Sequence, residues 1–218
     1  MSEPDTGAQL LTLRTNLQTA LLCSGIIGAV LFTTVYFCFG VISPNYEILR
    51  ESISRLQMQP YGWIQSVNFI LSGVLILTFA IALKNELAGG FGSVLIPLLQ
   101  ALTGMGSIAL GLLHDPELQV YTGWIIFLSL IVSFLLLSRR FMANPQWRGW
   151  AAYTILCILL MIALCAVFNY AIAHNSNYSG VFERLIVVIR LVWLFFFTAR
   201  LLGGRSLAPV NNPEVETV

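Results

Sequence analysis

Long apolar runs dominate this chain and restrict what it can fold into. Six are present, and the first five contain no Asp, Glu, Lys or Arg. A bilayer core about 30 Å thick needs about 20 apolar residues for one helical crossing, which is close to the length of each run. We therefore predict transmembrane helices over residues 17–41, 63–83, 93–113, 119–138, 149–172 and 181–202.

The overall composition agrees with a lipid environment. Only 10% of the residues are charged and 57% are hydrophobic, whereas soluble domains carry about 25% charged residues. These charges are too few to coat a water-facing surface, so the predicted fold class is an all-α integral membrane bundle. The net charge of +1 and the lack of a basic stripe exclude nucleic acid as a partner.

The polar segments divide the chain into three parts. Residues 1–16 are predicted to be a cytoplasmic tail, residues 17–202 the six-helix transmembrane domain, and residues 203–218 a disordered cytoplasmic tail. Between the first and second spans, residues 44–57 place Ile and Leu on one side and charged residues elsewhere. That pattern is typical of a short helix lying at the membrane interface.

The orientation follows from the loop charges. With a cytoplasmic N-terminus, seven basic residues lie inside and three lie outside, which the positive-inside rule favours. The inside residues are Arg14, Lys84, Arg139, Arg140, Arg148, Arg200 and Arg205, and the outside residues are Arg50, Arg55 and Arg184. We therefore expect both termini to lie in the cytoplasm.

Two of the apolar helices carry polar stripes at helical spacing. Gln65 and Asn68 share one face of the second span with a serine, and Gln100, Thr103 and Ser107 continue towards His114 along the third. Two interpretations stay open. The stripes either pack against neighbouring helices through small and hydroxyl side chains, or they line a polar cavity in the outer half of the bundle.

Arg190 is the sharpest single signal, because it lies deep in the sixth span. A central arginine costs roughly 2.5–3.5 kcal/mol on insertion scales, so its guanidinium must face a partner or water. Glu183 lies seven residues earlier on the same face. The arginine can serve as a structural ion pair or hydrogen-bond hub, as a binding group for an anion, or as a side chain that snorkels to the interface.

Catalytic and metal-binding patterns are weak. His114 and His174 show no HxxxH or HExxH spacing, so the sequence predicts neither a metal site nor a cofactor. Serine catalysis would need a base near a serine such as Ser54, and no GxSxG elbow is present. The candidate ligand-binding residues are Arg190, Glu183, Gln65, Asn68, Gln100, Thr103, Ser107, His114, Ser54 and Arg55.

The chain resembles a family of membrane proteins catalogued as domain of unknown function 998. The matching residues are Ile53, Ser54, Leu56, Gly62, Trp63, Asn68, Phe69, Gly73, Gly106, Gly111, Asp115, Pro116, Gly180, Glu183, Arg184, Trp193 and Leu201. The resemblance implies a six-helix protein of mainly prokaryotic origin, and hence an inner (plasma) membrane location. Thr122-Gly123 stands where a histidine is expected, so no histidine-dependent chemistry carries over.

Three functional hypotheses follow. The first is a non-enzymatic protein that binds or moves a small amphiphile or lipid, with Arg190 at the anionic end and residues 44–57 as a lid. The second is an intramembrane enzyme acting on a lipid, with Ser54, His114, Asp115 or Glu183 as acid–base groups. The third is a structural subunit of a membrane complex, which the many small residues in the helices favour.

Overall fold

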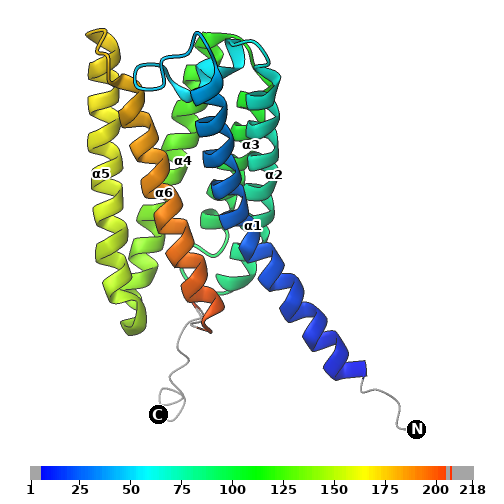
Figure 1. The fold of residues 1–218 in the computed structure, drawn as a ribbon. Helices are drawn as coiled ribbons and strands as arrows, with labels where there is room; N and C mark the ends of the chain where they lie inside the picture. The colour runs from blue at the N-terminus through cyan, green and yellow to red at the C-terminus, as the bar shows by residue number, and fades with distance from the viewer. Residues whose placement is uncertain (1–5, 205–206, 208–218) are drawn as a thin grey trace.

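The computed structural model describes residues 6–204 and 207, and within them the chain forms a bundle of long helices without strands (Figure 1). All six long helices are long and apolar enough to cross a membrane. The elements are α1 (Thr6–Ile42), η1 (Ile53–Met58), α2 (Trp63–Glu86), α3 (Leu95–Leu112), α4 (Pro116–Ala143), η2 (Pro145–Trp147), α5 (Arg148–Ala173) and α6 (Ser179–Leu202).

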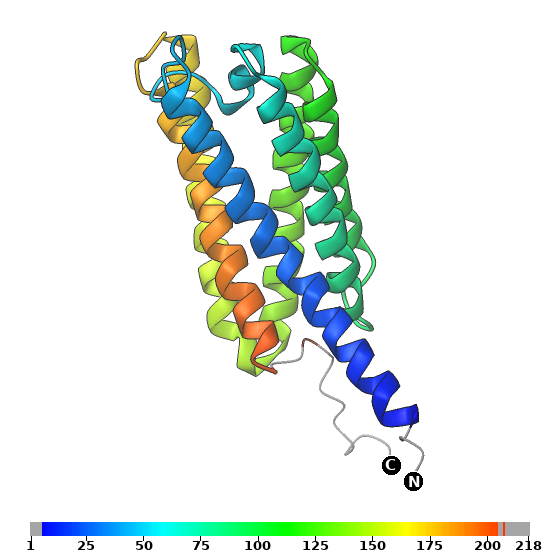
Figure 2. The ribbon, with the colours of Figure 1, turned by 45° about the vertical axis from the view of Figure 1, so that its right-hand side comes forward.

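The long helices form a closed ring. Each packs against the next one along the chain, and α6 returns to contact α1 (Figure 2). The start of α1 and the end of α6 lie at one end of the bundle, which we call the terminal end (Figure 1). The connection between α1 and α2 lies at the opposite end, which we call the loop end.

The predicted start of the first helix differs from the structure. Helix α1 begins at Thr6 rather than at residue 17, because residues 8–16 contain no proline or glycine to break it. Its apolar span starts at Thr15. Of the tails predicted for residues 1–16 and 203–218, residues 1–5, 205–206 and 208–218 lie outside the described residues.

The helix expected over residues 44–57 does not form as one element. Only Ile53–Met58 is helical, as the short 3₁₀ helix η1, and the preceding residues lie in turns and bends. The physical reason is a competing set of partners. The carbonyls of Leu49 and Arg50 accept hydrogen bonds from the backbone of α6, which holds this stretch along α6 instead of in a local helix.

Aromatic side chains fill the terminal half of the bundle. Phe134 packs on Trp193 with ring centroids 4.1 Å apart, and Trp193 stacks on Phe197 with ring centroids 4.6 Å apart. Each of these three side chains is at most 2% exposed. Trp193 donates a hydrogen bond of 3.0 Å to the hydroxyl of Thr154 on α5. We call this set, with Phe141 packed beside Phe197, the aromatic layer.

Helices α2 and α3 approach each other through glycines. A Cβ atom on Gly73 would lie 2.5 Å from the carbonyl oxygen of Gly104, and one on Gly104 would lie 2.9 Å from that of Gly73. Farther towards the loop end, Gly111 lies against the backbone of Ser66 in the same way. This contact is closer than side chains would allow, and it fixes the register of the two helices.

Candidate functional site

A cavity of about 360 Å³ lies inside the ring, in the half of the bundle near the loop end. All six long helices and the segment Ser52–Ser54 contribute to its wall. Leu130 and Leu194 lie at its deep side, next to the aromatic layer. Its volume falls within the range of about 300–1,000 Å³ that is typical of small-molecule sites.

Arg190 lines this cavity from α6. Its neighbours on the same wall include Val187, Leu191 and Leu194, all apolar. Among the described residues it forms neither a hydrogen bond nor an ion pair. A guanidinium carries five N–H donors, so the cavity contains a full set of unused donors beside a positive charge.

Glu183 also lines the cavity, two turns nearer the loop end on the same helix face. Its carboxylate accepts a hydrogen bond of 2.8 Å from the backbone N–H of Ile53. It does not pair with Arg190. The ion pair found in the described part of the chain joins Arg50 and Glu47 at 3.8 Å, on the surface. Among the described residues Arg190 therefore takes part in neither an ion pair nor a set of hydrogen bonds.

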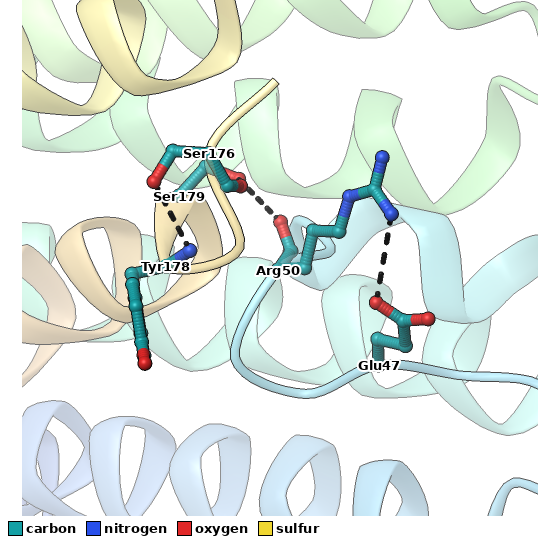
Figure 3. Close-up of polar contacts among 5 residues, drawn as sticks. All are labelled: Glu47, Arg50, Ser176, Tyr178 and Ser179. Atoms are coloured by element: carbon teal, nitrogen blue, oxygen red, sulfur yellow. Dashed lines mark hydrogen bonds and ion pairs between the residues drawn. The ribbon is translucent and has the colours of Figure 1, made fainter. Parts of the chain in front are cut away.

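Backbone hydrogen bonds fasten the loop to the start of α6. Gly180 and Val181 donate from their N–H groups to the carbonyls of Arg50 and Leu49, each at 3.1 Å. The hydroxyl of Ser179 also donates to the Arg50 carbonyl, whereas the Arg50 side chain points away to Glu47 (Figure 3). We call these contacts, together with those of Arg184, the loop clamp.

Arg184 completes the loop clamp with its side chain. It donates 3.0 Å to the carbonyl of Glu51 and also donates to the hydroxyl of Tyr46. Tyr46 in turn donates 2.9 Å to the carbonyl of Ser52. Burial raises the pKa of Tyr46 to about 12, the Arg184 charge opposes that shift, and the Glu183 charge adds to it. The clamp therefore contains a neutral phenol at physiological pH.

Four residues of the predicted polar stripes do not line the cavity, because they are used in helix contacts. Gln100 donates 3.0 Å to the Ser133 hydroxyl on α4, and Thr103 bonds back to the carbonyl of Leu99. Asn68 donates to the Phe32 carbonyl on α1 and to Gln65 within its own helix. The packing interpretation fits these residues, and the cavity interpretation does not.

The remaining candidates divide between the cavity and the surface. Ser54 and Ser107 line the cavity. Arg55 and His114 are exposed, and His114 contacts only the carbonyl of Leu112. Within the residues the structure describes, no group of three or more His, Cys, Asp and Glu is close enough together to hold a metal ion.

The sequence reasoning missed a glutamine pair at the loop end of the cavity. Gln119, which lines the cavity, donates 2.6 Å to Gln57 and 2.8 Å to the carbonyl of Leu113. Gln57 donates to the Ser66 hydroxyl and to the carbonyl of Leu110. The sequence did mark Gln119, because it is the first residue of an otherwise apolar span. The spacing of residues could not identify its partner in the loop.

Comparison with known proteins identifies the family. The family model described as "Protein of unknown function (DUF998)" matches residues 26–200, which include the second half of α1 from residue 26 on, all of α2 to α5 and nearly all of α6. No curated protein and no protein of solved structure matches the chain. A match over this much of the sequence, with six apolar helices inside it, shows that the chain is a multi-pass membrane protein belonging to the DUF998 family.

Proposed function

We propose that this protein binds a small amphiphilic anion in the membrane, with the anionic group at Arg190 and the apolar body against the surrounding wall. The observation that carries the proposal is the unpaired guanidinium of Arg190 inside a cavity of about 360 Å³. A charged group without a partner inside the membrane raises the free energy of the protein, and a bound anionic ligand would lower it.

The character of the wall supports an amphiphile rather than a fully polar solute. Phe69, Trp124, Phe127 and Phe168 line the cavity together with many aliphatic side chains. Such a wall favours apolar groups by the hydrophobic effect, whereas the single cation favours a carboxylate or phosphate. A ligand with one anionic end and an apolar body satisfies both requirements.

The enzyme hypothesis has less support. Ser54 and Glu183 line the cavity, but Asp115 caps α4 through the N–H groups of Glu117 and Leu118, and His114 lies on the surface. The four groups suggested for acid–base chemistry are not brought together. A nucleophile without a base within hydrogen-bond reach does not form the arrangement that covalent catalysis needs.

The charge distribution supports an orientation. Lys84, Arg139, Arg140, Arg148 and Arg200 all lie at the terminal end of their helices. By the positive-inside rule we propose that this end faces the cytoplasm and that the cavity lies in the outer half of the inner (plasma) membrane. The proposed ligand would then come from the outer leaflet or the space beyond it.

The test compares binding of octadecanoate, a simple long-chain carboxylate, by purified wild-type protein and Arg190→Leu. A hydrogen bond to a charged group contributes about 1.5–3 kcal/mol, so we expect the dissociation constant to rise about 10- to 150-fold. Because Arg190 has no protein partner, the variant should be at least as heat-stable as the wild type.

Arg55→Leu is the matched control, since it removes an exposed arginine outside the cavity and should leave binding unchanged. Arg190→Lys keeps the charge but loses the forked geometry of the guanidinium, so its affinity for octadecanoate should fall between those of the wild type and Arg190→Leu. Wild-type affinity in Arg190→Leu would overturn the proposal. So would a large loss of heat stability, which would show that Arg190 holds the bundle together.

A further inference from the structure

Two serines that line the cavity have hydroxyls without a hydrogen-bond partner in the described part of the chain. Ser72 on α2 is 4% exposed and its hydroxyl has no partner, and Ser107 on α3 is 8% exposed and forms no hydrogen bond within the described part of the chain. Other helical hydroxyls bond back to their own helix, as Thr33 does to Ala29 and Ser129 to Ile125. Thr198 on α6 also lacks a partner, but it does not line the cavity, whereas the two serines do.

The helix register places the two hydroxyls at one level. Gly73 lies against both Gly104 and Ile108. Residue 73 of α2 is therefore level with the middle of the turn of α3 between these two residues. Because the two helices are antiparallel, one step back along α2 corresponds to one step forward along α3. Ser72 is thus level with Ser107, and the two form a pair across neighbouring helices on the cavity wall.

This serine pair lies nearer the loop end than Arg190 does. It is close to the level of Ile126 on α4, which Gly106 faces. Arg190 lies three residues before Trp193, which packs on Phe134 of α4. With a rise of 1.5 Å per residue, the backbone of Arg190 lies about 8 Å nearer the terminal end than the backbones of the two serines, and its side chain leans back towards the loop end.

We propose that Ser72 and Ser107 form a second binding subsite, which recognises an oxygen on the apolar chain of the ligand. This inference rests on the proposed function and narrows its ligand class to long-chain carboxylates with a hydroxyl or keto group on the chain. Each serine hydroxyl can both donate and accept, so the pair suits either group. A plain alkyl chain would leave both hydroxyls unpaired in an apolar site, which is unfavourable.

The test measures two probes with the purified full chain: octadecanoate, and octadecanoate with a mid-chain hydroxyl. We expect the wild type to bind the hydroxylated probe about 5- to 10-fold more tightly, as one added hydrogen bond would give. In the double variant Ser72→Ala/Ser107→Ala this preference should disappear, while affinity for octadecanoate stays the same or rises. Ser129→Ala is the matched control, because that buried serine lies outside the cavity wall, and it should keep the preference.

The outcomes separate the two proposals. Equal binding of both probes by the wild type, or a preference that survives in the double variant, overturns the serine subsite and leaves the Arg190 proposal intact. Failure of the wild type to bind either probe overturns both. Loss of the preference in Ser129→Ala as well would also reject the assignment, since the effect would then come from general changes in packing.

Discussion

Replacing Arg184 with glutamine should loosen the loop clamp in a way that can be calculated from its contacts. The side chain gives the loop two charge-assisted hydrogen bonds, to the carbonyl of Glu51 and to the hydroxyl of Tyr46. At about 1.5 kcal/mol each these contribute about 3 kcal/mol, and release of its buried, unpaired Nε returns about 1 kcal/mol. A net loss of about 2 kcal/mol corresponds to about 30-fold faster local opening.

Hydrogen–deuterium exchange of the loop and the start of α6 measures this opening. The informative amides are those of Ile53, Gly180 and Val181, which donate across the clamp. Arg50→Gln is the control, because that side chain forms only a surface ion pair at 3.8 Å, and such pairs contribute about 0–1 kcal/mol. We expect less than about fivefold acceleration there. Equal acceleration in the two variants, or none in Arg184→Gln, would refute the role given to the Arg184 guanidinium.

Two further predictions concern packing and pH. Gly73→Ala should lower the free energy of unfolding by about 1–3 kcal/mol, because the new Cβ would lie 2.5 Å from a backbone oxygen. Gly123→Ala has nothing within 4 Å and should raise it by about 0.5–1 kcal/mol, and thermal unfolding in detergent compares the two. Because the pKa of Tyr46 is raised to about 12, the folded state keeps the neutral phenol, and stability should fall as pH rises from 10 towards 12. Tyr46→Phe should show a smaller fall in an alkaline denaturation series, and an unchanged fall would show that other groups account for it.

The transmembrane helices were predictable because hydropathy is a local property of the chain. An uncharged apolar run of about 20 residues has few alternatives to a membrane helix, whatever its neighbours are. The loop was not predictable in the same way. The spacing of Ile48, Ile53 and Leu56 fits an amphipathic helix, but the carbonyls of Leu49 and Arg50 are bound by α6, about 130 positions later. A contact between residues that are so far apart in the chain produces no periodic pattern in the sequence.

The site shows the same division between local and long-range information. Arg190 could be singled out because a charge deep within an apolar run must face the protein or water, and it lines the cavity. The polar stripes could not be assigned, since periodicity gives the face of a helix but not the neighbour it meets. Gln100 meets Ser133 on α4 and Asn68 meets a carbonyl of α1, which removes both from the cavity wall.

The aromatic layer makes the two directions of travel from the cavity unequal. To pass towards the terminal end, a molecule beside Arg190 would have to separate Phe134, Trp193 and Phe197 at once, breaking the hydrogen bond to Thr154 as well. On the other side it meets the connecting loop, which is held by hydrogen bonds to α6 and by a smaller hydrophobic cluster that includes Ile53 and Leu56. The terminal end of the cavity is therefore closed by a continuous set of packed rings, and the loop end by contacts of a short connecting segment.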